Sequence, residues 1–118
     1  MSDLAGELRA RTKQFAIRVV KMFQALPPRE EARLIGRQVL RAATSVAANY
    51  RAVCRARSKA EFVAKMGIVV EEADETVFWL ELLVDAGIVG PERMKELLQE
   101  ANELLCIFAA SRRTAKSR

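Results

Sequence analysis

Helix-breaking residues are scarce in this chain, and their positions limit the folds that it can adopt. Among 118 residues there are five glycines and three prolines, and the breaks fall at Pro27-Pro28, Gly87 and Gly90-Pro91. Between these breaks apolar residues recur at intervals of three and four, which is the spacing of an amphipathic helix. A content of 51% hydrophobic and 30% charged residues is typical of one soluble domain with a single core. The sequence therefore predicts an all-α fold.

The apolar repeats and the breaks divide the chain into four helices. Pro27-Pro28 closes the first helix, and Ser58 precedes Glu61 at the spacing of a capping box, which marks the start of the third. Gly87 is placed to end that third helix. Because the connections are short, sequential helices are antiparallel neighbours, and we predict an up-down-up-down antiparallel four-helix bundle. Its helices are expected over about residues 3–26, 29–57, 59–86 and 91–111, followed by a basic tail over 112–118.

The second predicted helix has two opposed faces. At about 100° per residue, its arginines fall within a sector of roughly 120°, and an apolar set is centred on the far side. The apolar face must pack, whereas the basic face is free to meet an anion, and arginine suits bidentate contact with phosphate or carboxylate. We therefore expect this stripe and part of the tail to bind nucleic-acid backbone. The candidate residues are Arg29, Arg33, Arg37, Arg41, Arg51, Arg55, Arg112 and Arg113.

Charge is distributed unevenly along the chain. The net charge is +9 over residues 1–66 and −8 over residues 67–111, and the tail is basic again. In a tight hairpin of the second and third helices, Arg41 lies level with Asp74 and Glu75, so ion pairs between the two helices are expected. The alternative for the arginine stripe is thus a solvated face laced with such pairs. The tail is expected to be frayed and free to contact phosphates.

The residue types present exclude much catalytic chemistry. The chain has no histidine and no glycine-rich phosphate loop, which removes imidazole-based acid–base catalysis and most zinc sites. Carboxylate-bridged metals in bundles use a Glu-x-x-His pair, and the nearest match here, Glu72-x-x-Glu75, lacks the histidine. Cys54 and Cys106 have no CxxC spacing, which favours buried, reduced thiols. We expect no enzymatic activity, no cofactor and no metal.

Phe78 and Trp79 are left over from the core pattern of the third helix. They project beside its main seam, and an exposed pair of this kind marks a subunit contact more often than a chemical site. The alternative is that both side chains cap the core of a monomer.

The longest unbroken apolar run, from Leu104 to Ala110, is too short to span a bilayer, and the first residues contain no apolar segment resembling a signal peptide. These features favour a cytoplasmic location without membrane contact.

Several short motifs are spread over about residues 8–108. They are Arg11-Thr12-Lys13, Glu31-Ala32-Arg33, Arg41-Ala42-Ala43-Thr44-Ser45-Val46, Ala48-Asn49-Tyr50-Arg51, Ser58-Lys59-Ala60-Glu61-Phe62, Glu72-Ala73-Asp74-Glu75-Thr76 and Trp79-Leu80-Glu81-Leu82-Leu83. Together they resemble the bacterial four helix bundle protein family. This family is also called the 23S rRNA intervening-sequence or S23 family, because some members are encoded within insertions in 23S ribosomal RNA genes.

The resemblance implies an up-and-down bundle that assembles as a homopentamer. The architecture of this family is similar to that of the accessory variability protein of diversity-generating retroelements, a basic pentameric bundle that engages nucleic acid and a reverse transcriptase. It supplies no catalytic residues. We therefore expect a non-enzymatic oligomer that binds structured RNA or DNA, with a reverse transcriptase or another nucleic-acid enzyme as a further partner. The alternative is an oligomeric protein–protein adaptor with no direct nucleic-acid role.

Overall fold

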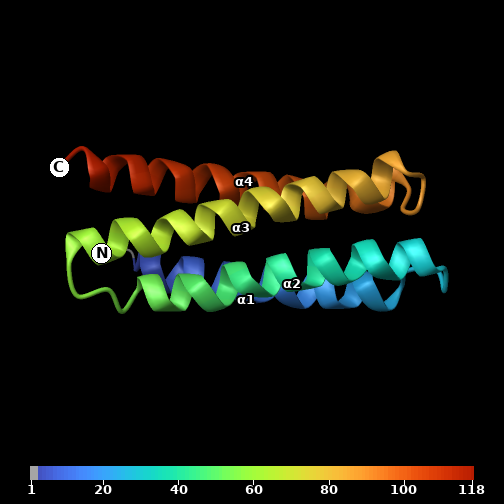
Figure 1. The fold of residues 1–118 in the computed structure, drawn as a ribbon, viewed down its shortest axis with the longest axis horizontal. Helices are drawn as coiled ribbons and strands as arrows, with labels where there is room; N and C mark the ends of the chain where they lie inside the picture. Colours follow the sequence, from blue (N-terminus) through green and yellow to red (C-terminus); the bar gives the residue numbers. More distant parts are fainter. Residues whose placement is uncertain (1–2) are drawn as a thin grey trace.

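The computed structural model describes residues 3–118, in which four helices form an all-α antiparallel bundle (Figure 1), confirming the predicted fold. Helices α1 and α3 each pack against both α2 and α4, and within the described residues the diagonal pairs do not meet. The bundle measures 46 × 26 × 19 Å. Its helices are α1 (Leu4–Gln24), α2 (Glu30–Val53), α3 (Lys59–Asp85) and α4 (Pro91–Lys116).

Helix ends follow from local chemistry. The Asp3 side chain caps α1 by accepting a hydrogen bond from the Gly6 backbone N–H at 2.9 Å. Ser58 does the same for α3, accepting from the Glu61 N–H at 3.0 Å, as the capping-box spacing predicts. Gly87 follows the end of α3 and has a φ of +73°. A residue in this left-handed conformation stops a helix, and glycine adopts it without strain.

The predicted end of the second helix is wrong, since α2 stops at Val53 rather than at residue 57. Beyond it the backbone N–H groups of Arg55 and Ala56 bond to the carbonyls three residues earlier, at 3.1 and 3.0 Å. This tighter turn lets the chain leave the helix axis and cross to α3. Residues 54–58 therefore form a connection, and Arg55 lies outside the helix.

The core runs along the bundle axis and receives side chains from all four helices. In it the Tyr50 ring packs on Phe108 with 5.2 Å between ring centroids. Gly36 is buried, and a Cβ at this position would overlap Leu26 and lie 2.9 Å from the Phe23 ring. The absence of a side chain here therefore lets the α1–α2 connection lie against α2. The largest fully buried side chains are Phe108, Met66, Leu80, Leu83, Met94 and Leu104.

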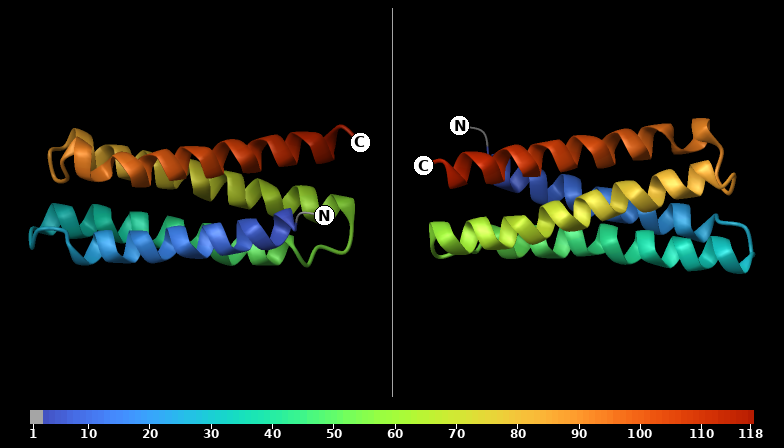
Figure 2. Two further views of the ribbon diagram at one scale, coloured as in Figure 1. Left: turned by 180° about the vertical axis from the view of Figure 1, so that it is seen from behind. Right: turned by 45° about the horizontal axis from the view of Figure 1, so that its top comes forward.

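The two ends of the bundle differ. The α1–α2 and α3–α4 connections lie together at one end, and the α2–α3 connection lies with the C-terminus at the other (Figures 1 and 2). None of the helices described over residues 3–118 is long and apolar enough to cross a membrane.

Candidate functional site

Three arginines of the predicted stripe stand on the outward face of α2. Arg33, Arg37 and Arg51 are exposed, and among the residues that the structure describes no carboxylate lies within 4 Å of them. Arg33 and Arg51 are separated by five helical turns, so they point the same way and stand about 27 Å apart along the axis. These charges face solvent.

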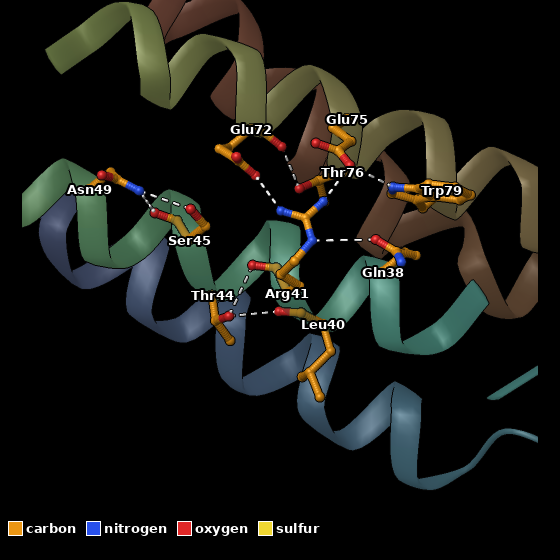
Figure 3. Close-up of polar contacts among 10 residues, drawn as sticks. All are labelled: Gln38, Leu40, Arg41, Thr44, Ser45, Asn49, Glu72, Glu75, Thr76 and Trp79. Carbon is orange, nitrogen blue, oxygen red and sulfur yellow. Dashed lines mark hydrogen bonds and ion pairs between the residues drawn. The ribbon is translucent and has the colours of Figure 1, made fainter. Parts of the chain in front are cut away.

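Arg41, one turn from Arg37, is held by α3 (Figure 3). Its guanidinium bonds to the Glu72 carboxylate at 3.2 Å and to the Glu75 carboxylate, and its Nε donates to the Gln38 side chain at 3.3 Å. Two carboxylates thus offset one cation. Arg41 is therefore not available to a phosphate in the way that its neighbours are.

The expected partner Asp74 does not take part in this contact. Glu72 and Glu75 lie three residues apart and face the same way on α3, whereas Asp74 is rotated by about 200° from Glu72. Asp74 is consequently exposed on another side of the helix. Arg41 thus pairs with α3 at the predicted height along the bundle, and Glu75 is a partner as expected. The second partner is Glu72 instead of Asp74, because Glu72 lies on the side of α3 that faces Arg41.

The carboxylates of α3 belong to a hydrogen-bonded network. Glu75 also accepts a bond from the Trp79 indole N–H at 3.1 Å, and the Glu72 carbonyl accepts one from the buried Thr76 hydroxyl at 2.7 Å (Figure 3). Glu72-x-x-Glu75 therefore binds an arginine. In the described part of the chain, no group of three His, Cys, Asp or Glu residues is placed to hold a metal ion.

Two further stripe arginines lie off the face of α2. Arg29 is the residue before the helix, and its Nε is 3.5 Å from the Glu31 carboxylate. Arg55 is exposed in the α2–α3 connection. Their spacing from the other arginines fits the helical repeat, which is why the sequence pattern placed both on one face. The helix itself covers only Glu30–Val53, so Arg29 and Arg55 lie just outside its two ends.

The expectation of a frayed tail is wrong, because α4 continues to Lys116. Arg112 lies along α3: its Nε donates to the Val63 carbonyl at 3.0 Å, and its guanidinium covers Gly67, where a Cβ would come within 3.1 Å of the Nε. The first turns of α3 thus provide a surface on which the end of α4 packs. Arg113, on the next position of the helix, is exposed.

The structure adds two cations that the sequence interpretation missed. Arg9 and Lys13 of α1 are exposed and border, with Arg51, a groove whose floor is Ala10, Ala16, Ile17, Val20, Thr44, Ala47 and Ala48. Arg9 and Lys13 line this groove from α1 and Arg51 lines it from α2, so no pattern within one helix brings the three cations together. We call Arg9, Lys13, Arg33, Arg37 and Arg51 the basic face.

The remaining candidates differ from one another in exposure. Phe78 is 54% exposed, and its ring meets the half-buried Trp79 edge-on with 4.9 Å between centroids. Cys54 is half-buried, but Cys106 is exposed, contrary to the expectation of burial. Cys106 lies outside the core seam of α4, to which Leu104 contributes.

The fold and sequence are similar to known proteins. The solved structures that match include the crystal structure of a protein of unknown function from the S23 ribosomal protein family, from Bacteroides thetaiotaomicron VPI-5482. It is 28% identical in sequence, with a TM-score of 0.84, and the match covers 92% of this chain and 97% of that one. No curated protein is similar enough to this chain to be counted as a relative. The family model described as 23S rRNA-intervening sequence protein matches residues 7–110. The chain belongs to this family.

Proposed function

We propose that this protein is a non-enzymatic, self-associating bundle that binds the phosphate backbone of structured RNA or DNA through the basic face. The observation that carries the proposal is the set of five exposed cations on α1 and α2, none within 4 Å of a carboxylate of residues 3–118. Such a face attracts polyanions whatever their sequence, because phosphate contacts carry no base information.

Self-association gives this face its affinity. Five cations on one subunit make only a weak contact at physiological salt, but several copies on one assembly bind the same polyanion with a much higher effective concentration. Phe78 supports the proposed self-association, because an exposed aromatic side chain is the type enriched in subunit contacts.

The test is a titration of labelled structured RNA and duplex DNA at several salt concentrations, followed by fluorescence anisotropy. If all five cations contact phosphates, the slope of log affinity against log salt is about −4.5 per subunit on duplex DNA. Changing Arg33, Arg37 and Arg51 to Gln together should weaken binding and make that slope shallower by about 2.7 per subunit.

The matched control changes Lys59, Lys95 and Lys116 to Gln, which removes the same charge from exposed positions on α3 and α4. It should bind almost as the parent does. If both triple variants lose affinity equally, the binding is a general effect of net charge and the basic face has no special role. Absence of binding even at low salt would favour the adaptor hypothesis instead.

A further inference from the structure

A hollow lies away from the basic face, lined by residues of the α1–α2 and α3–α4 connections and of the helix ends beside them. Figure 2 shows these two connections together at one end of the bundle. The hollow has a volume of about 700 Å³, which is within the range of small-molecule sites. Its apolar floor combines buried and half-buried side chains: Met22, Leu26, Pro27, Ile88, Val89, Met94 and Leu97. We call it the end cleft.

Four cations from three separate segments border the end cleft. Arg18 and Lys21 come from α1, Arg29 from the α1–α2 connection, and Arg93 from α4, whereas Glu96 is the one acidic residue of the lining. No carboxylate of residues 3–118 lies within 4 Å of Arg18, Lys21 or Arg93. Four cations against Glu96 give the lining a net charge of +3, although Arg29 is also 3.5 Å from the Glu31 carboxylate outside the lining.

Like charges gathered around a hollow repel one another, and concave low-dielectric walls concentrate their field. A bound anion relieves this repulsion, and arginine side chains can hold a phosphate by paired hydrogen bonds. Inorganic phosphate alone would leave the apolar floor in contact with water, so a ligand that also covers the floor with an apolar group should bind more tightly. The complementary ligand has a phosphate group joined to an apolar body.

We propose that the end cleft binds a nucleotide unit, with its phosphate among Arg18, Lys21 and Arg93 and its base against the apolar floor. This chemistry is shared by a free mononucleotide and by the phosphorylated end of a nucleic-acid strand. The site uses none of the residues of the basic face, so either proposal can fail alone.

The experiment is an NMR titration of the ¹⁵N-labelled full chain with AMP, with adenosine and with inorganic phosphate. AMP should shift the amides of Val89 and Gly90, and it should bind about tenfold or more tightly than adenosine or phosphate alone. Changing Arg18 and Arg93 to Gln should weaken AMP binding about tenfold, whereas the matched pair Arg57→Gln with Arg118→Gln, which is exposed and lies outside both proposed sites, should leave it within about twofold.

If the Arg18 and Arg93 changes impair folding, Lys21→Gln with Arg29→Gln serves instead, because both side chains are exposed.

Tetranucleotides with and without a 5′-phosphate identify whether the ligand is a free nucleotide or a strand end. Cleft shifts with AMP alone indicate a free nucleotide, and shifts that need the 5′-phosphate on the strand indicate a strand end. The proposal is overturned if AMP and the phosphorylated strand leave the Val89 and Gly90 amides unmoved, or if the Arg57 and Arg118 changes weaken AMP binding as much as the Arg18 and Arg93 changes do.

Discussion

Arg37 and Arg41 are one turn apart on α2, yet their environments differ. Arg37 has no carboxylate within 4 Å in residues 3–118, whereas Arg41 lies between Glu72 and Glu75. The difference arises because successive positions four residues apart rotate by about 40° around a helix, which brings Arg41 to the edge that faces α3. One of these arginines therefore contributes to packing of the bundle and the other to its surface charge.

Replacing Arg41 by Gln should lower the free energy of unfolding by about 0.5–1 kcal/mol, because the pair is half exposed and screened by solvent. Replacing Arg37 by Gln should change it by less than about 0.5 kcal/mol. Urea denaturation followed by circular dichroism measures both. Equal effects of the two changes would contradict the assignment of Arg41 to the α2–α3 contact.

Tyr50 illustrates how burial changes the chemistry of one residue. Burial, with a smaller contribution from the neighbouring Cys54, raises the pKa of its hydroxyl from 10.0 to about 12. Tyr50 is the sole tyrosine of the chain, so its ionisation can be followed without interference from another.

The raised pKa predicts alkaline destabilisation. Below about pH 10 the hydroxyl is protonated in both the folded and the unfolded chain and adds no pH dependence. Between about pH 10 and 12 the unfolded chain loses the proton while the folded protein keeps it, so the free energy of unfolding falls by up to about 1.4 kcal/mol per pH unit. Tyrosinate absorbance should have its midpoint near 12 in the native protein and near 10 in urea. A native midpoint at 10 would refute the prediction, and Tyr50→Phe should remove this part of the pH dependence.

At the scale of elements, two helix ends are decided by what lies beside them. α2 ends at Val53 because the chain must turn toward α3, although the arginine repeat continues in the numbering. α4 continues to Lys116 because the first turns of α3 lie alongside and provide the Val63 carbonyl and the bare surface of Gly67. Both ends thus depend on the position of α3, which the residues at the ends of α2 and α4 do not themselves indicate.

The contact between α4 and α3 predicts a contrast between adjacent arginines. Arg112→Ala should lower the free energy of unfolding by about 1 kcal/mol, through loss of the hydrogen bond to Val63 and of packing on Gly67. Arg113→Ala should have an effect below about 0.5 kcal/mol, because its side chain is exposed. Guanidinium denaturation compares the two. If both changes are neutral, the end of α4 contributes nothing to stability.

At the scale of the whole molecule, the bundle separates charge by sequence position. The basic face occupies α1 and α2, whereas α3 and α4 carry most of the acidic residues, and the Arg41 and Arg11 ion pairs link the two halves. Much of the positive charge is left at the surface, because within residues 3–118 only Arg11 and Arg41 of α1 and α2 pair with carboxylates of α3 or α4. A polyanion would therefore approach from the α1–α2 side.

Phe78→Asp tests the proposed self-association. Wild-type protein should sediment as an oligomer, and the variant should shift toward the 13.2 kDa monomer, because a carboxylate would be buried without a partner in the contact. Leu4→Asp, at a side chain that is 59% exposed on α1, is the control and should leave the assembly intact. A variant that sediments as the parent does would exclude Phe78 from the contact.

The sequence by itself determined the number and order of the helices, their antiparallel connection and the caps at Ser58 and Gly87. These follow from periodicity and from the conformations of serine and glycine, which are local properties. It also indicated a basic stripe and its approximate level against Glu75.

Only the tertiary structure decided which cations remain unpaired, because pairing depends on the rotation of each helix against its neighbour. It bound Arg41 and Arg112 to α3, brought Arg9 and Lys13 beside Arg51, and gathered the four cations of the end cleft from segments that are distant in sequence. Side chains far apart in the chain share a surface only once the helices have packed, and no local pattern records that arrangement.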